Sequence, residues 1–230
     1  MRNAVTREPE LEVVVAPVGV DAVAYRELKG FSYGVKRAFD RMVAAAALVV
    51  LAVPMLVIAA VVRLTSPGPA IIGQTRVGRY GRTFTFYKFR SMREDAELLR
   101  DDLEGENNHD APQIFKMRRD PRVTPVGRFL RRTSLDELPN LFNVLKGEMS
   151  IIGPRPPLPR EVMHYDAHHL QRLSAVPGIT GLWQVRGRSE LPFEEMVELD
   201  LEYIERWSLM FDLIILLRTP LAVFGGRGAW

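Results

Sequence analysis

The longest hydrophobic stretch of the chain lies in its first third. Residues 42–62 form an uninterrupted run of 21 uncharged positions between Arg41 and Arg63. As a straight helix this run would be about 31 Å long, close to the thickness of the hydrocarbon core of a bilayer. The pattern therefore predicts a membrane helix over about residues 36–65.

Two features of this helix favour a re-entrant path over a simple span. Pro54, near the middle, lacks a backbone N–H and clashes with the carbonyl of Val50, so a break at Pro54 is expected. Basic residues flank both ends of the run, and such residues favour the cytoplasmic side. They are Lys36, Arg37 and Arg41 before the run and Arg63, Arg76, Arg79, Arg82, Lys88 and Arg90 after it. A kinked spanning helix stays open, because membrane helices tolerate proline when neighbours satisfy the backbone.

Shorter patterns after this run predict a small β element and several helices. Alternating apolar positions predict a strand at residues 83–89, and turn-rich composition predicts a hairpin within residues 177–189. Helices are expected at about residues 91–103, 135–145, 160–172, 193–205 and 209–224, with loops at 104–113 and 153–159. The last helix is too short to span a bilayer and suits the membrane surface or the core.

The predicted fold class is therefore α+β and predominantly helical. It combines a re-entrant N-terminal helix, a break and a second helix with amphipathic interfacial helices and a small β element. A length of 230 residues suits one large domain, expected over residues 33–230. Residues 1–32 form a separate N-terminal segment, and whether it is flexible or binds a partner stays open.

Composition narrows the chemistry. The chain has 31 Lys and Arg against 28 Asp and Glu, a net charge of +3, and 47% of its residues are hydrophobic, as in a folded protein. It contains no cysteine, which excludes disulfides, thiolate metal sites and a cysteine nucleophile. Carboxylates, hydroxyls and phosphates remain as candidate reactive groups.

Charge alternates sharply in the middle of the chain. Residues 94–110 contain eight acidic positions and one arginine, whereas residues 116–132 contain seven basic positions and one aspartate. The basic segment suits either the anionic headgroups of a membrane or a phosphate site. The pattern by itself leaves both interpretations open.

The segment with the most reactive groups is RRTSLDELPN, residues 131–140. Ser134 and Glu137 have the spacing of a capping box, which would start a helix and place Asp136 in its first turn. At such a helix start the free N–H groups lower carboxylate pKa values and attract phosphate. Asp136 is thus a candidate nucleophile or metal ligand, although a purely structural helix start stays open.

Two further motifs carry weaker signals. Pro154-Arg155-Pro156 presents a guanidinium from a stiff backbone, which suits recognition of a phosphate or base but equally suits a polyproline connector. His164 and His168 are four residues apart with Glu161 one turn earlier, a geometry that could hold a metal, yet the pattern offers no further ligand. The role of these histidines and of His169 stays open.

Taken together, four motifs resemble the monotopic phosphoglycosyl transferases, also called bacterial sugar transferases. They are the hydrophobic run with Pro54, YKFRSM at residues 87–92, RRTSLDELPNLFNVLKGEMSIIGPRP at 131–156 and PGITGLWQVRGRS at 177–189. The resemblance extends from about Tyr33 to the C-terminus. It implies an enzyme of the bacterial cytoplasmic membrane, with its catalytic domain on the cytoplasmic face. Such enzymes move a sugar-1-phosphate from a UDP-sugar to polyprenyl (undecaprenyl) phosphate and release UMP, which initiates exopolysaccharide or glycoconjugate assembly.

The resemblance also implies roles for individual residues. Asp136 matches the nucleophile that forms an aspartyl-phosphosugar intermediate, and it is the expected contact for Mg²⁺, while Glu137 completes a catalytic dyad. The remaining matches bind substrate or shape the membrane helix. They are Lys88, Arg131 and the nucleotide-contacting Pro154, Arg155 and Pro156, together with Pro54 at the helix break.

The resemblance is looser in the C-terminal part. Arg186 and Arg188 are expected to face the sugar, and the last third of the chain resembles enzymes that begin exopolysaccharide with glucose or galactose. Val53 departs from the family, because some members carry a serine before the break. The identity of the sugar, the polyprenol length and the division of labour between Asp136 and Glu137 stay open.

The expected partners are a UDP-sugar, polyprenyl phosphate and membrane lipids, with a homodimer left open and no nucleic acid. A second hypothesis, from a different class of function, is that the chain is a non-catalytic, membrane-tethered protein that binds nucleic acid or anionic lipid through the basic segment. A third hypothesis is that it is a structural membrane adaptor. The nucleic-acid hypothesis predicts steep salt dependence of binding. The adaptor hypothesis predicts that the pair of adjacent carboxylates would not be intact, whereas Asp136 and Glu137 are both present.

Overall fold

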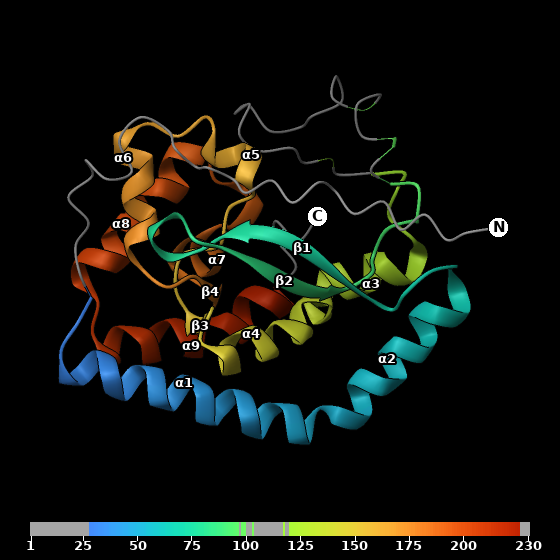
Figure 1. Ribbon diagram of the computed structural model, residues 1–230, viewed down its shortest axis with the longest axis horizontal. Coiled ribbons are helices and arrows are strands. Elements are labelled where there is room, and N and C mark those ends of the chain that lie inside the picture. Colours follow the sequence, from blue (N-terminus) through green and yellow to red (C-terminus); the bar gives the residue numbers. More distant parts are fainter. Residues whose placement is uncertain (1–27, 97, 100–102, 104–116, 118–119, 226–230) are drawn as a thin grey trace.

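The computed structural model describes residues 28–96, 98–99, 103, 117 and 120–225. These residues form a predominantly helical fold, as predicted, and the small β element is present as two separate two-stranded sheets. Two long helices run along one side, and a two-stranded ribbon and shorter helices lie above them (Figure 1). The loop predicted at residues 104–113 and most of the N-terminal segment 1–32 lie outside the described residues.

The hydrophobic run folds as two helices, α1 (Phe31–Val50) and α2 (Ala52–Thr65), which are bent by 64° relative to each other. The break lies at Leu51, so its prediction at Pro54 is wrong by three residues. Pro54 occupies the first turn of α2, where backbone N–H groups have no helical partner and a proline is tolerated. Because Pro54 cannot donate to Val50, the interruption falls at the preceding turn.

No single helix among the described residues is long and apolar enough to cross a membrane. The bent pair α1 and α2 meets the requirements of length and composition when the two helices are taken together. This is the arrangement expected of either a broken span or a re-entrant segment.

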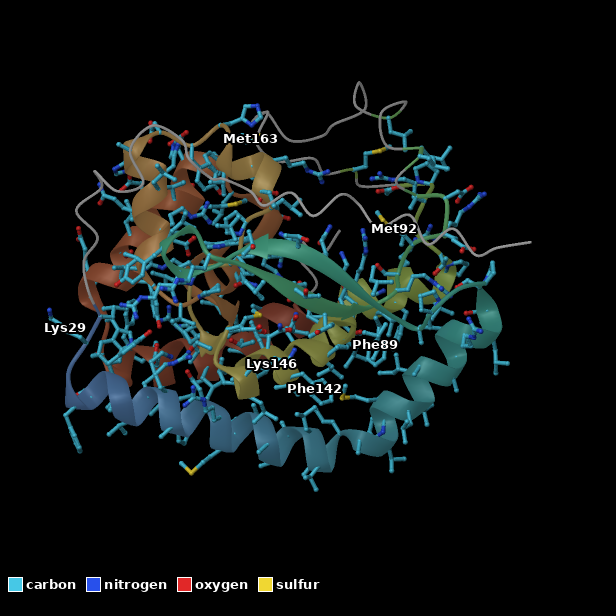
Figure 2. All side chains as sticks on the ribbon, viewed as in Figure 1. Lys29, Phe89, Met92, Phe142, Lys146 and Met163 are labelled. Atoms are coloured by element: carbon cyan, nitrogen blue, oxygen red, sulfur yellow. The ribbon has the colours of Figure 1, made fainter. Side chains whose placement is uncertain are left out.

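Apolar contacts hold both arms of this bent pair against the rest of the chain. Ala44 of α1 packs into one cluster, and Met55 and Val62 of α2 pack into another with Phe89 and Leu130. Phe89, labelled in Figure 2, is fully buried near the place where α2 approaches α3. The bend is therefore fixed by tertiary packing as well as by the local break.

The ribbon consists of β1 (Ile71–Val77) and β2 (Thr83–Phe89), which pair in antiparallel fashion across the short 3-10 helix η2 (Arg79–Gly81). The strand predicted at residues 83–89 is confirmed, whereas β1 was not predicted. In the observed register Gln74 opposes Phe86 and Ile72 opposes Lys88. Because side chains alternate along a strand, Gln74, Arg76 and Lys88 share one face of the ribbon.

The second sheet pairs β3 (Ser150–Ile152) and β4 (Gly178–Thr180) in parallel. The hairpin predicted within residues 177–189 is therefore wrong, because β4 pairs with a distant strand and is followed by α7 (Leu182–Arg186). A Cβ on Gly178 would lie 2.1 Å from the backbone nitrogen of Gly153, so this close pairing requires glycine.

The remaining helices complete the fold. They are α3 (Pro125–Thr133), η4 (Leu135–Asn140), α4 (Leu141–Lys146), α5 (Pro159–Val162), α6 (Ala167–Leu170), η5 (Gln171–Ser174), η6 (Arg188–Glu190), α8 (Phe193–Arg206) and α9 (Leu209–Phe224). The helices predicted at 193–205 and 209–224 are confirmed, and the helix predicted at 135–145 is present as η4 followed by α4.

Two predicted helices are wrong. The helix expected at 160–172 is divided into three short ones, because the side chain of Asp166 accepts a hydrogen bond from the N–H of His169 and starts a new helix. The first part of the helix expected at 91–103 forms turns, and Met92 bridges Val123. The backbone N–H of Arg93 donates there to the carbonyl of Arg122, so contacts with a distant segment hold residues 92–93 in an extended path.

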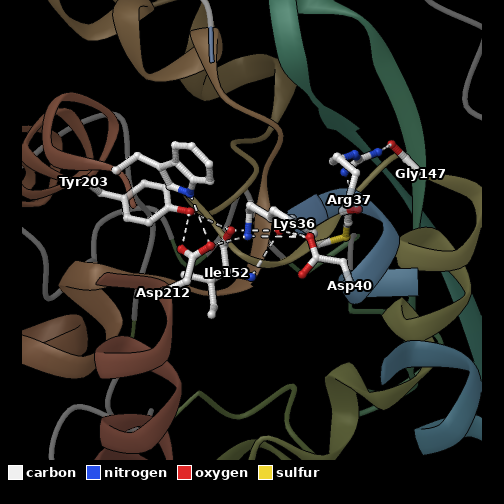
Figure 3. A network of polar contacts seen from close by, with 10 residues as sticks. Lys36, Arg37, Asp40, Gly147, Ile152, Tyr203 and Asp212 are labelled. Carbon is white, nitrogen blue, oxygen red and sulfur yellow. Dashed lines mark hydrogen bonds and ion pairs between the residues drawn. The ribbon is translucent and has the colours of Figure 1, made fainter. Parts of the chain in front are cut away.

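A buried polar network joins α1 to the rest of the molecule (Figure 3). Lys36 of α1 lies 2.8 Å from Asp212 of α9 and 3.5 Å from Asp40, and all three side chains are buried. The hydroxyl of Tyr203 in α8 donates to Asp212, and the hydroxyl of Ser150 in β3 donates to Asp40. Four elements thus share one cluster of paired charges beneath the ribbon.

Candidate active site

The two adjacent carboxylates, Asp136 and Glu137, lie in η4, immediately after α3. Ser134 separates the two helices and adopts a left-handed backbone, with φ 56° and ψ 17°. Its side chain does not cap η4, so the predicted capping box is wrong; an N-cap residue normally needs an extended backbone. The turn nevertheless places both carboxylates side by side, as the sequence predicts.

Asp136 is only 9% exposed. Burial, followed by the negative charge of Glu137, raises the pKa of Asp136 from 3.8 to about 6, although Arg131, Lys88 and Arg155 oppose this shift. The sequence pattern suggested a lowered pKa, which is wrong because desolvation outweighs the few aligned peptide dipoles of a six-residue helix. No hydrogen bond to this carboxylate is found among the described residues.

Arg131 approaches the dyad from the last turn of α3. Its Nε donates to the hydroxyl of Ser91 at 2.9 Å, and Ser91 is buried just after β2. A Cβ on Gly127 would lie 1.9 Å from the carbonyl oxygen of Ser91, so a glycine in α3 is needed for this contact between helix and chain. The close approach explains how α3 brings Arg131 toward Asp136.

Lys88 and Arg76 reach the site from the two strands of the ribbon and share one acceptor. The Oε1 of Gln74 accepts from Arg76 Nη2 at 2.9 Å and from Lys88 Nζ at 3.3 Å. Burial, followed by the positive charges of Arg76 and Arg131, lowers the pKa of Lys88 to about 8. Burial likewise lowers the pKa of Arg76 to about 10.

Lys88 is expected at the site from the sequence, whereas Gln74 and Arg76 are not. The signal that could have found them is the alternation of IIGQTRV, because a strand there places both side chains on one face. That strand becomes evident only when its partner β2 is considered with it.

The loop that contains Pro154, Arg155 and Pro156 closes the site from the other side. Arg155 Nη1 lies 2.9 Å from Glu137 Oε1, and this negative charge raises the pKa of Arg155. The carbonyl of Pro156 accepts from Arg76 at 2.9 Å, which joins the loop to the ribbon. The structure therefore brings the predicted residues Lys88, Arg131, Arg155, Asp136 and Glu137 into one site, whereas Pro54 lies apart from it in α2.

Arg186 and Arg188, both expected near the sugar, differ in position. Arg186 pairs with Glu202 at 2.9 Å on an exposed surface. Arg188 is half-buried and donates to the hydroxyl of Ser134 at 2.9 Å, which places it beside the dyad. The structure thus brings only Arg188 to the candidate site.

The structure describes four bases of the basic segment; Arg122 and Arg131 make contacts within the fold, whereas Arg128 and Arg132 are exposed. Arg122 forms a buried ion pair with Asp120 at 2.8 Å, and Arg131 turns toward Ser91. Lys116, Arg118 and Arg119 lie outside the described residues, as does most of the acidic segment. Among the described bases of this segment, only Arg131 supports the phosphate-site interpretation, and the exposed Arg128 and Arg132 suit either one.

The histidines lie away from the dyad. His168 Nε2 is 2.7 Å from Glu198, and His169 Nε2 is 3.0 Å from Glu194, so α6 is tied to α8 by two imidazole–carboxylate contacts. Within the described part of the chain, no group of three or more His, Cys, Asp and Glu side chains is arranged to hold a metal. The metal interpretation of His164 and His168 therefore gains no support.

Comparison with known proteins identifies the family. The model of the bacterial sugar transferase family matches residues 31–226. The exopolysaccharide production protein ExoY of Sinorhizobium fredii is 39% identical over 90% of this chain and 92% of its own length. The undecaprenyl-phosphate galactose phosphotransferase of Salmonella typhimurium is 43% identical over 85% of this chain. A UDP-glucose:undecaprenyl-phosphate glucose-1-phosphate transferase of Escherichia coli is 41% identical over 88% of it.

The chain spans only 41% and 43% of the lengths of the Salmonella and Escherichia relatives. The matched part nevertheless includes the bent helix pair, the ribbon, the dyad and the loop around Arg155. Because one family model covers most of the chain and relatives cover it at this level of identity, the chain belongs to the bacterial sugar transferase family.

Proposed function

We propose that this protein transfers a sugar-1-phosphate from a UDP-sugar to polyprenyl phosphate, releases UMP and so initiates exopolysaccharide or glycoconjugate assembly. The observation that carries the proposal is the position of Asp136. It is a buried carboxylate that is mostly ionised at neutral pH. The positive charges of Arg131, Lys88 and Arg155 lie near enough to offset part of the rise in its pKa. An anionic nucleophile surrounded by cations suits attack on a diphosphate, whose own charge would otherwise repel it.

The proposed reaction has two displacements at one phosphorus. A carboxylate oxygen of Asp136 attacks the β-phosphorus of the UDP-sugar, the bond from this phosphorus to the bridging oxygen breaks, and UMP leaves with the electron pair. A phosphate oxygen of the polyprenyl phosphate then attacks the same phosphorus. The bond to Asp136 breaks, and the free carboxylate is restored together with the polyprenyl diphosphate sugar.

The surrounding cations have distinct supports and are proposed to bind different parts of the donor. Lys88 and Arg131 are held by Gln74 and Ser91, which orients them toward the phosphate groups. Arg155 is held by Glu137 and stands on the proline-rich loop, which suits contact with the nucleotide. Arg155 and Pro156 also line a cavity whose walls include the rings of Tyr165, Trp183 and Phe193.

The residues present also fit Mg²⁺, which often takes only one or two protein carboxylates and completes its shell with water and substrate phosphates. Asp136 is the proposed protein ligand, because its carboxylate has no hydrogen-bond donor among the described residues. When bound, the ion would neutralise charge on the diphosphate. Glu137 is proposed to keep Arg155 in place through their 2.9 Å ion pair.

The bent pair α1 and α2 is proposed to enter and leave the cytoplasmic leaflet of the bacterial cytoplasmic membrane. In support, the pair exposes large apolar side chains along its length, including Val49, Val53, Leu56 and Leu64. Exposed apolar residues of α9, such as Leu213 and Leu217, would lie at the same surface. This topology keeps both basic flanks and the site on the cytoplasmic side.

Glucose or galactose is the proposed sugar. The Salmonella relative is named for galactose and the Escherichia relative for glucose. Both hexoses are therefore the donors to test first.

The decisive experiment is UMP release from purified membranes that contain the protein, with Mg²⁺, polyprenyl phosphate and either UDP-glucose or UDP-galactose. The wild-type chain is expected to release more than one equivalent of UMP per enzyme from one of these donors only when polyprenyl phosphate is present, because the first displacement alone releases a single equivalent. Asp136→Asn removes the nucleophile and should abolish release, whereas Asp95→Asn, on an exposed turn, should not change it. UMP release by Asp136→Asn at the wild-type rate would show that Asp136 is not the nucleophile.

A further inference from the structure

Two strained residues meet beside the dyad. Among the described residues, the non-glycine positions with positive φ are Tyr80, Ser134 and Arg188. Ser134 has φ 56° and Arg188 has φ 55°, values that residues with a Cβ adopt only rarely. Such conformations persist when the surrounding structure holds them, and they are frequent at functional sites.

A single guanidinium connects these residues. Arg188 Nη2 donates to the Ser134 hydroxyl at 2.9 Å, and Arg188 Nη1 donates to the carbonyl of Ala222 at 3.2 Å. Ser134 precedes Asp136 by two residues, and Ala222 lies near the end of α9. The planar fork of the side chain thus ties the turn that carries the dyad to the C-terminal helix.

The left-handed conformation of Ser134 is what makes this contact available. In an ordinary N-cap the hydroxyl would accept a backbone N–H of the following helix, but here it makes no capping bond. The hydroxyl instead accepts from Arg188. A glycine would adopt the same backbone with less strain, yet it would lack the acceptor.

We infer that Arg188 is a positioning residue for phosphoryl transfer, which fixes the turn that presents Asp136 by holding the hydroxyl of Ser134. This inference rests on the proposed function, because it assumes that Asp136 is the nucleophile. It differs from a role in sugar binding, because the two observed partners of the guanidinium, Ser134 and Ala222, are groups of the protein itself. The predicted consequence is a defect in turnover without a defect in donor binding.

A double-mutant cycle tests the inference, with kcat and KM for the UDP-sugar measured by UMP release. Arg188→Gln and Ser134→Gly should each lower kcat by about tenfold, the effect of losing one hydrogen bond to a charged group, and change KM by less than about twofold. The double variant should be no slower than the slower single variant, because both changes remove the same contact. Arg188→Lys, which retains charge but cannot bridge both acceptors, should be intermediate.

Two controls separate positioning from stability. Ser134→Gly should unfold at the same temperature as the wild type or a higher one, because glycine relieves the strain at φ 56°, so reduced activity cannot come from loss of fold. Arg186→Gln, which breaks an exposed ion pair two residues away, should leave kcat unchanged.

Three results would overturn the inference. They are wild-type kcat in Ser134→Gly, fully additive losses in the double variant, or a raised KM in Arg188→Gln with no change of kcat. The last result would assign Arg188 to the substrate. Asp136→Asn measured alongside keeps the two proposals distinct: activity in that variant removes Asp136 as nucleophile, whereas the cycle alone decides whether residues 134 and 188 act as a unit.

Discussion

At the scale of single residues, the environment of Asp136 sets both its reactivity and its effect on stability. The same burial that removes water from the carboxylate also raises its pKa to about 6, above the ordinary value of 3.8. A carboxyl with a raised pKa in the folded state destabilises that state wherever it is ionised. The protein thus keeps at its centre a charge that would be better solvated in the unfolded chain.

Asp136→Asn should therefore stabilise the protein while it abolishes activity. The neutral amide removes the desolvated charge, and we expect a gain of about 2 kcal/mol in the free energy of unfolding at pH 7.5. The gain should shrink as the pH falls from 6 toward 4, because the wild-type carboxyl then takes up its proton in the folded state. Thermal unfolding of both proteins in detergent at pH 7.5 and near pH 4 measures this difference. A gain in stability that is the same at the two pH values would contradict the prediction.

The pH dependence of kcat/KM should have two limbs set by residues of the site. Activity should fall below about pH 6 as Asp136 is protonated, and above about pH 8 as Lys88 loses its proton and its attraction for the diphosphate. Lys88→Arg should move the basic limb to higher pH, since a guanidinium stays charged, and leave the acidic limb in place. A basic limb unchanged in Lys88→Arg would assign that limb to another group.

At the scale of elements, the bend between α1 and α2 combines a local cause with a distant one. Pro54 prevents one helical hydrogen bond, but the direction of α2 follows from the packing of Met55 and Val62 against Phe89 and Leu130. A proline alone specifies a weak point in a helix and not the angle at which the two arms meet.

The re-entrant topology can be tested with single cysteines, because the chain has none of its own. Phe31→Cys and Leu64→Cys place thiols near the two ends of the bent pair, where the native side chains are 89% and 86% exposed. A membrane-impermeant maleimide should modify neither in intact spheroplasts and both in inverted vesicles. The control is Asp95→Cys, which lies outside the bent pair on an exposed turn and is expected on the cytoplasmic side. Modification of one end from outside would show a spanning helix.

At the scale of the whole molecule, the network around Lys36 joins α1 to helices α8 and α9 and to strand β3. Lys36 forms ion pairs with Asp40 and Asp212, and the Tyr203 hydroxyl that donates to Asp212 also lies 3.0 Å from the carbonyl oxygen of Ile152 in β3 (Figure 3). A buried ion pair adds little net stability compared with apolar packing, but it is costly to break. The network therefore specifies how α1 sits against α9.

Lys36→Met should destabilise the protein strongly, because it leaves two buried carboxylates without their cation. We expect a loss of about 3 to 5 kcal/mol in the free energy of unfolding, measured by thermal or chemical denaturation in detergent. Arg93→Met, which breaks an exposed ion pair with Asp95, should change it by less than about 1 kcal/mol. Equal effects of the two substitutions would show that burial does not strengthen the network.

Much of the chemistry can be predicted from the sequence, because it is carried by contiguous motifs. Asp136 and Arg155 stand out as candidates from their local residues, Lys88 and Arg131 are expected at the site from the family resemblance, and the strand 83–89 and the last two helices are predicted almost to the residue. These features depend on local periodicity and on side-chain type, both of which a linear sequence records.

The sequence by itself thus determined the hydrophobic run, its weak point, the adjacent carboxylates and the family to which they belong. Only the tertiary structure decided the angle between α1 and α2, the pairing of β4 with β3, the raised pKa of Asp136 and the contact of Arg188 with Ser134. All four have the same physical reason, which is that burial and hydrogen bonding between segments far apart in the chain can outweigh local propensity. Neither effect follows a fixed spacing of residues along the sequence.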